Sequence, residues 1–135
     1  TVPLAKAAEV QVDRYTGEQL VLSAPLNCNI NDKGTAFGGS LYNISVMAGW
    51  GMTSLICREL GLQGDIVVAK GEIEYLSPLK GRLVATVDKP PAAQIEHFLA
   101  SYVARGKASI TQEVSIPDES GKCCVRFIGK YAIVN

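Results

Sequence analysis

Hydrophobic and polar residues alternate along five segments of the chain, and such alternation predicts β-strands. The first segment, residues 10–26, contains the turn-prone pair Thr16-Gly17 and has Pro25 near its far end, and it is predicted to form a single strand. The other predicted strands are DIVVAKGEIEYLSPLKG (65–81), GRLVATVDKP (81–90), KASITQEVSIP (107–117) and KCCVRFIGKYAIV (122–134). Hairpin-type links between the later strands indicate an antiparallel sheet.

The longest helical segment follows a glycine-rich loop and carries no charge. No charged side chain lies between Lys33 and Arg58, although glycines and small polar residues are spread through this run. A membrane-spanning helix needs about 20 apolar residues, but these interruptions and the alternating strands elsewhere argue against a membrane protein. A helix that is apolar on every side is otherwise one surrounded by protein. We therefore predict a buried helix from the loop to about Leu60, stopped by Gly61.

Two shorter helices are also predicted. Residues 92–106 place apolar side chains at positions i, i+3, i+4, i+7 and i+8, and Gly106 ends this pattern. Near the N-terminus, Thr1 and Pro3 occupy the cap and first-turn positions of a short helix.

These elements predict one α+β domain made of residues 1–135. A flat sheet cannot cover a helix that is apolar all round, so the sheet must curl around the helix or a second subunit must cover the remainder. Residues 66–69 are apolar on both faces of their predicted strand. We therefore expect a homodimer, paired along the strand that contains Val67 to Tyr75.

The composition argues against several classes of partner. Thirteen basic residues balance 13 acidic ones in the 135-residue chain, so neither nucleic acid nor a membrane is expected as a partner. The four cysteines form no C-x-x-C pair, so no metal site is expected, and free, buried thiols in a reducing cytoplasm are the expected state. The single histidine, His97, falls on the polar face of the helix at residues 92–106 and is expected at the surface.

Three stretches of the sequence resemble a known family. NDKGTAFGGSLYNISVMAGWGM, IVVAKGEIEYLSPLKG and SGKCCVRFIGKYAIV are similar to the hotdog-fold thioesterase domain that occurs alone or at the C-terminus of some bacterial N-acetyltransferases. The resemblance covers nearly the whole chain, and GTAFGGSLY and YLSPLKG are its most specific parts. It implies the hotdog fold, an antiparallel sheet curled around one long central helix.

The resemblance also implies an assembly and a substrate. Hotdog proteins work as homodimers, either alone or doubled into tetramers, and bind an acyl thioester of coenzyme A or of an acyl-carrier protein in a tunnel at the subunit boundary. No cofactor is implied. The N-terminal end of the central helix faces the thioester in such proteins.

The glycine pair Gly38-Gly39 occupies that helix start. The first N–H groups of a helix lack internal partners and lie at the positive end of its dipole. In related hotdog enzymes the N–H of the glycine matching Gly39 polarises the thioester carbonyl, so the resemblance implies this role for Gly39, with Gly38 and the preceding Phe37 in contact with the substrate. The alternative is that the two glycines only permit a tight turn from loop to helix.

The catalytic base is where this sequence departs from the family pattern. Many hotdog thioesterases carry N-x-x-G-x-x-H-G-G, and Phe37 stands here in place of the histidine. Those enzymes also carry Asp or Glu seven residues after the second glycine, where this chain has Val46. Two loop residues remain as candidates: Asn31 to orient a water molecule or the thioester, and Asp32 as general base. Asp32 is alternatively a solvated or turn-capping residue of the loop.

Further polar residues complete the candidate site. Asn43 and Ser45, one to two turns into the helix, are expected either to hold water or to bond helix carbonyls. Lys70, Arg105 and Lys107 are candidate contacts for the phosphates of coenzyme A, and each is alternatively a solvated charge.

The residues leave more than one function open. Hydrolysis of an acyl thioester is the leading interpretation, and a non-catalytic acyl-CoA-binding or dimerisation module is the alternative, favoured by the missing helix carboxylate. Hydration or dehydration of enoyl thioesters fits poorly, because that chemistry in this fold usually uses a histidine, and neither the loop nor the long helix has one.

Overall fold

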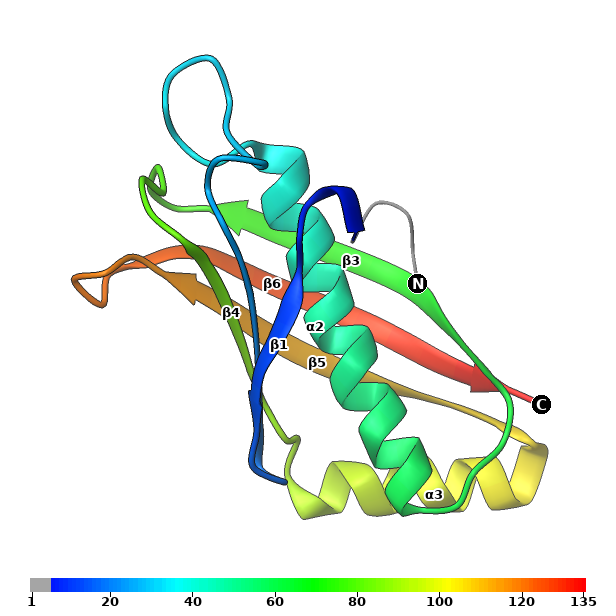
Figure 1. Cartoon of the computed structure of the whole chain (residues 1–135). Coiled ribbons are helices and arrows are strands. Elements are labelled where there is room, and N and C mark those ends of the chain that lie inside the picture. The colour runs from blue at the N-terminus through cyan, green and yellow to red at the C-terminus, as the bar shows by residue number, and fades with distance from the viewer. Residues whose placement is uncertain (1–5) are drawn as a thin grey trace.

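The computed structural model describes residues 6–135, which form one antiparallel sheet around a long helix (Figure 1). The elements are, in chain order, β1 (Gln11–Tyr15), β2 (Gln19–Ala24), α2 (Gly38–Glu59), β3 (Asp65–Tyr75), β4 (Leu83–Asp88), α3 (Ala92–Arg105), β5 (Lys107–Pro117) and β6 (Cys123–Val134). The six strands are arranged in the order β1-β2-β4-β5-β6-β3. This confirms the predicted α+β hotdog arrangement. The start of the predicted N-terminal helix, at Thr1 and Pro3, lies outside the described residues.

The segment predicted as the first strand is instead a hairpin of β1 and β2. The hydroxyl oxygen of Thr16 accepts hydrogen bonds from the backbone N–H groups of Glu18 (3.2 Å) and Gln19 (3.1 Å). Gly17 has a φ of 92°, a conformation that glycine adopts without steric cost. The single-strand prediction was wrong because Thr16-Gly17 was treated as an interruption, although this pair reverses the chain.

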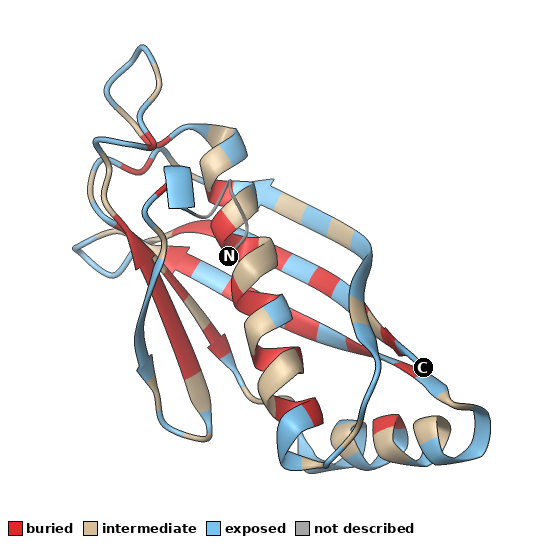
Figure 2. Cartoon of the chain, turned by 45° about the vertical axis from the view of Figure 1, so that its right-hand side comes forward, coloured by how far each residue is buried: buried red, intermediate tan, exposed pale blue. Residues whose placement is uncertain are grey.

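Helix α2 is the central element, and its buried residues recur every three or four positions along one wide face. They are Leu41, Ile44, Ser45, Ala48, Gly49, Met52, Thr53, Ile56 and Cys57. This face contacts β2, β3, β4, β5 and β6, while tan and pale blue residues lie on the opposite face (Figure 2). On that side the exposed Trp50 and half-buried Val46 leave apolar surface that the sheet does not cover.

A glycine allows the sheet to approach α2 closely. A Cβ atom at Gly49 would lie only 2.5 Å from Cζ of Tyr131. Tyr131, on β6, is fully buried, and its hydroxyl donates a hydrogen bond to the Val46 carbonyl oxygen at 2.6 Å. Burial raises the pKa of Tyr131, so this hydroxyl stays protonated as a donor. Gly49 therefore lets the helix lie close to β6.

The surface predictions are confirmed in part. Helix α3 packs against β5 and fully buries only Phe98, and His97 is exposed as predicted. All four cysteines are free thiols, but only Cys57 and Cys124 are buried, and Cys28 is exposed. No helix within residues 6–135 has the length and apolar character that crossing a bilayer requires.

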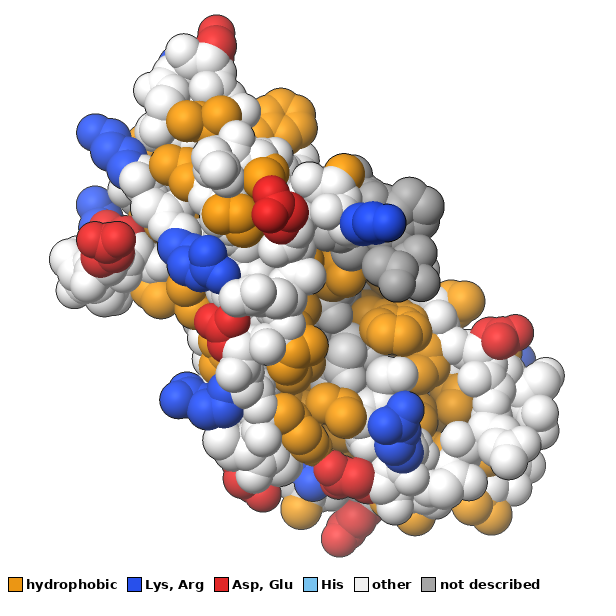
Figure 3. All heavy atoms as spheres, in the orientation of Figure 1, with side chains coloured by type: hydrophobic (Ala, Val, Ile, Leu, Met, Phe, Trp, Pro, Cys, Tyr) orange, Lys and Arg blue, Asp and Glu red, His pale blue; other side chains and the backbone are white. Residues whose placement is uncertain are grey.

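Strand β3 forms one edge of the sheet and exposes apolar side chains. Val67 is 45% exposed and Val68 is 41% exposed. The edge of a sheet presents unpaired backbone N–H and C=O groups to a further strand. Figure 3 shows the molecule from the side on which α2 lies, and hydrophobic side chains gather on this surface. The Trp50 indole N–H donates to the Ile66 carbonyl oxygen of this edge at 3.3 Å, so the edge lies beside exposed apolar surface of α2.

Candidate functional site

The site begins where the loop after β2 meets α2. The Phe37 N–H donates a hydrogen bond to the Asn29 carbonyl oxygen at 2.6 Å. Asn29 is buried, and its side-chain amide donates to the carbonyl oxygens of Ala8 (3.0 Å) and Pro25 (2.7 Å). These bonds fix the base of the loop and thereby the start of the helix. Sequence reasoning missed Asn29, because its bonding partners are brought to it only by folding.

The first two residues of α2 have backbone N–H groups that no acceptor in the described part of the chain pairs. Phe37 is the N-cap, and its carbonyl oxygen accepts from the N–H groups of Ser40 (3.0 Å) and Leu41 (3.1 Å). Within residues 6–135, no acceptor pairs with the N–H of Gly38 or of Gly39. These two glycines, called here the glycine entrance, therefore present unpaired donors at the positive end of a helix whose first charged residue is Arg58.

Two exposed aromatic rings flank the glycine entrance. The Phe37 ring lies over Gly39, where a Cβ atom would come within 2.5 Å of Phe37 Cε2. Tyr75, at the end of β3, donates its hydroxyl hydrogen to the Gly38 carbonyl oxygen at 2.9 Å. Phe37 is 55% exposed and Tyr75 is 54% exposed. Phe37 was a predicted site residue, whereas Tyr75 was not, although it lies in the family-like stretch YLSPLKG.

The loop candidates Asn31 and Asp32 have different surroundings. The Asn31 side-chain oxygen accepts from the backbone N–H groups of Lys33 (2.9 Å) and Thr35 (3.1 Å), and its amide donates to the Thr35 hydroxyl (2.8 Å). Asp32 is exposed, and no side chain of residues 6–135 forms an ion pair with its carboxylate. The loop projects beyond the start of α2 (Figure 1). Asn31 thus shapes the loop, and Asp32 is presented to solvent on it.

The helix candidates Asn43 and Ser45 also differ. The Ser45 hydroxyl donates to the Leu41 carbonyl oxygen at 2.8 Å, which is the helix-carbonyl alternative considered from the sequence. The Asn43 side-chain nitrogen is buried and has no hydrogen-bond partner within the described residues. Asn43 lies one turn after Gly39 on the same side of the helix. Of the two side chains, Asn43 therefore retains an unused donor for a water molecule or a ligand.

The basic candidates lie away from the glycine entrance. Lys70 forms an exposed ion pair with Glu72 at 3.1 Å. Arg105 donates a hydrogen bond to the Ser101 hydroxyl at 2.8 Å, and together with Lys107 it lines a shallow groove beside the end of β6. Arg105 and Lys107 are called here the basic pair.

The glycine entrance and the basic pair lie at opposite ends of the folded chain. Tyr75, at one end of β3, bonds Gly38. Asp65, at the other end, and Lys107 both pair with Val134. The 11 residues of β3 span roughly 33 Å in an extended strand. The folded chain by itself therefore does not bring the basic pair beside the glycine entrance.

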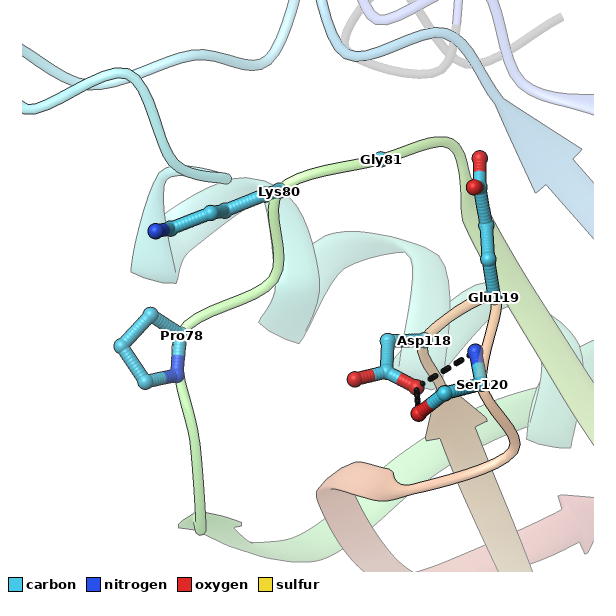
Figure 4. Close-up of a pocket in the computed structure, with 6 residues that line it drawn as sticks. All are labelled: Pro78, Lys80, Gly81, Asp118, Glu119 and Ser120. Atoms are coloured by element: carbon cyan, nitrogen blue, oxygen red, sulfur yellow. Dashed lines mark hydrogen bonds between the residues drawn. The ribbon is translucent and has the colours of Figure 1, made fainter.

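A separate pocket of about 230 Å³ lies between the β3–β4 loop and the β5–β6 turn (Figure 4). Its lining residues are Pro78, Lys80, Gly81, Asp118, Glu119 and Ser120. The Asp118 carboxylate accepts bonds from the Ser120 hydroxyl (2.6 Å) and the Lys122 N–H (3.0 Å), and chiefly the Ser120 bond holds the pKa of Asp118 below its usual value. This carboxylate closes its own turn, so we assign the pocket no role. Within residues 6–135, no three His, Cys, Asp or Glu side chains cluster as metal ligands.

Comparison with known proteins identifies the family. Residues 1–135 match the family described as "Putative thioesterase (yiiD_Cterm)". A protein of unknown function from Chlorobaculum tepidum TLS is 37% identical, with a TM-score of 0.95 over 99% of this chain and 88% of that one. A structure described as a putative thioesterase from Shewanella oneidensis is 35% identical, with a TM-score of 0.88 over 100% of this chain and 90% of that one.

A more distant structure shares the fold alone. A thioesterase from Haemophilus influenzae is 12% identical, with a TM-score of 0.76 over 100% of this chain and 85% of that one. The full-length family match and the two closer structures carry more weight. By that match, the chain belongs to the yiiD_Cterm thioesterase family.

Proposed function

We propose that the protein hydrolyses an acyl thioester of coenzyme A or of an acyl-carrier protein at the glycine entrance. The observation behind this proposal is the pair of unpaired N–H groups on Gly38 and Gly39, flanked by the exposed rings of Phe37 and Tyr75. A tetrahedral oxyanion is stabilised by donors that are already oriented before the reaction begins. Membership of a thioesterase family supports the same chemistry.

The proposed reaction uses one backbone donor and one carboxylate. The Gly39 N–H donates a hydrogen bond to the thioester carbonyl oxygen while a water molecule attacks the carbonyl carbon. Asp32 accepts a proton from this water, the carbon–sulfur bond breaks, and the thiolate leaves and takes up the proton. The products are a carboxylic acid and a thiol. Asn31 shapes the loop that carries Asp32, and the unused Asn43 donor holds the attacking water.

We further propose that a homodimer paired along β3 is the working unit. Antiparallel pairing of two β3 edges about a two-fold axis sets the Tyr75 end of one protomer beside the Asp65 end of its copy. The basic pair of one subunit then approaches the glycine entrance of the other, where the phosphates of coenzyme A require cations. The exposed apolar residues Val67, Val68 and Trp50 support this pairing, because a copy would remove them from water.

Sedimentation at micromolar concentration is expected to give twice the monomer mass of 14.4 kDa. Val67→Lys should weaken the dimer about tenfold or more, since a lysine on a sheet edge opposes further strand pairing. Val103→Lys is the matched control, because Val103 is exposed on α3. A monomeric wild-type protein would contradict the proposed pairing.

The alternative function is a non-catalytic acyl-CoA-binding or dimerisation module. Val46 offers no base on the helix, and Asp32 is held by no neighbouring side chain that would aim it at a substrate. Both observations favour binding without hydrolysis.

A turnover panel separates the two functions. Purified protein is incubated with short-, medium- and long-chain acyl thioesters of coenzyme A and of an acyl-carrier protein, and thiol release is measured. Release from any of them supports hydrolysis. Binding of a non-hydrolysable thioether analogue without turnover of any thioester would establish the binding module instead.

We also propose that residues 1–135 act as one domain in the cytoplasm. The family match spans the same residues. The free state of all four cysteines supports a reducing compartment.

A further inference from the structure

The hydroxyl group of Tyr75 contacts the peptide unit on which the proposed chemistry depends. It donates to the Gly38 carbonyl oxygen at 2.9 Å, and that carbonyl shares a single peptide unit with the Gly39 N–H. In a planar trans peptide the C=O and N–H bonds point in opposite directions, and residues 6–135 contain no cis peptide. A hydrogen bond that holds the oxygen therefore also fixes the direction of the N–H on the other side.

This bond also strengthens the donor. Hydrogen bonds in a chain polarise one another, and condensed-phase estimates put the gain at about 10–30% per bond. An amide whose oxygen accepts a hydrogen bond carries more positive charge on its N–H. Tyr75 thus acts on the face of the peptide opposite to the substrate.

The surroundings of Tyr75 are consistent with this role. Its side chain is 54% exposed, so it adds little to the core. A Cβ atom at Gly38 would lie 3.5 Å from the Tyr75 hydroxyl oxygen, which is an ordinary van der Waals contact. The bond fastens the end of β3, the strand that we propose to pair between subunits, to the first turn of α2.

We propose that Tyr75 is a positioning residue that aims and polarises the Gly39 N–H toward the thioester carbonyl oxygen. This inference rests on the proposed function, because it needs Gly39 to be the oxyanion donor. Tyr75 touches neither the substrate carbonyl nor the attacking water in this arrangement, and it acts only through the Gly38–Gly39 peptide.

Tyr75→Phe tests the inference, because it removes one hydroxyl group and keeps the ring. Loss of a whole oxyanion donor costs about 100- to 1,000-fold in kcat. A tenth to a third of that effect on a logarithmic scale gives roughly a twofold to tenfold fall in kcat. KM should change less than about twofold, because uniform binding is retained.

Tyr102→Phe is the matched control. The Tyr102 hydroxyl also donates to a backbone carbonyl, that of Gln63, at 2.5 Å, and lies near the end of α3, away from the glycine entrance. It should lower the melting temperature about as much as Tyr75→Phe, yet leave kcat unchanged. Equal kcat in the wild type and Tyr75→Phe, or an equal loss in both variants, would overturn the positioning role.

A second readout does not depend on turnover. With ¹⁵N-glycine labelling, the Gly39 amide proton resonance should move upfield in Tyr75→Phe and stay in place in Tyr102→Phe. An unmoved resonance overturns the inference, even where kcat falls. If the wild type hydrolyses no thioester, the proposed function fails, and the catalytic role of Tyr75 fails with it. If the Gly39 resonance still shifts in that case, the hydrogen bond between Tyr75 and Gly38 is present and only the proposed hydrolysis is wrong.

Discussion

Replacing Asp32 by alanine is expected to lower kcat for acyl thioesters by about 100-fold or more, the usual scale for a general base. Asp32 is the carboxylate closest in sequence to the glycine entrance, and the helix position that carries a carboxylate in many hotdog thioesterases is Val46 here. Because Asp32 is exposed, its removal should change the free energy of unfolding by less than about 0.5 kcal/mol. Thiol release and thermal unfolding measure the two effects separately.

The control for this variant is Glu119→Ala, which removes an exposed carboxylate from the β5–β6 turn. It should retain full kcat. Binding of a thioether analogue should survive Asp32→Ala, since the glycine entrance and the basic pair remain. Full activity of Asp32→Ala would exclude Asp32 as the base and leave Asn31 or a water molecule held near Asn43.

Asn31→Ala should also lower kcat, but for a different reason. The variant loses three hydrogen bonds that shape the loop carrying Asp32. The loop should therefore present Asp32 less consistently, and the fall in kcat should be smaller than for Asp32→Ala.

Gly49→Ala is expected to lower the free energy of unfolding by about 3 kcal/mol, at the upper end of the usual cost of overpacking a core. The added methyl group would overlap the ring of Tyr131, which is fully buried and cannot move aside into solvent. Displacing the ring would also break its bond to the Val46 carbonyl oxygen. The higher helix propensity of alanine, worth about 1 kcal/mol at most, is too small to reverse this loss. The melting temperature should fall by roughly 10 °C.

Gly51→Ala is the matched control for this effect. A Cβ atom there would meet only Cδ2 of Leu20, at 2.9 Å, which is the end of a flexible side chain. The stability change should therefore stay within about 1 kcal/mol. An unchanged melting temperature for Gly49→Ala would contradict this prediction. It would show that α2 and β6 can move apart to admit a methyl group at little cost in stability.

A double mutant tests the cause of the Gly49 effect. Tyr131→Phe removes the hydroxyl, which is the atom nearest the new methyl group, but keeps the ring carbons Cζ and Cε2, at 2.5 Å and 2.6 Å from it. The double variant should be more stable than the sum of the two single effects predicts, by about 0.5–3 kcal/mol, because the two sites are in contact. Strict additivity would show that the ring carbons of residue 131, and not its hydroxyl, cause the overlap.

Much of the fold could be predicted because its signals are local. The uncharged run between Lys33 and Arg58 predicted a buried helix, and α2 occupies residues 38–59. The hairpin of β1 and β2 was missed, since alternation continues on both sides of Thr16-Gly17 and periodicity alone does not show that the chain reverses. The glycine entrance could be predicted because a helix start exposes its first N–H groups wherever it lies.

Apart from the β1–β2 hairpin, the sequence by itself determined the elements, and its resemblance to a thioesterase family implied a sheet curled around the long helix. Each follows from side-chain periodicity or from motifs that are continuous along the chain. The tertiary structure alone decided that Tyr75 bonds the Gly38 carbonyl oxygen and that the basic pair lies at the far end of β3. Both depend on contacts between residues far apart in the chain, and only the strand order and register of the folded sheet fix such distances.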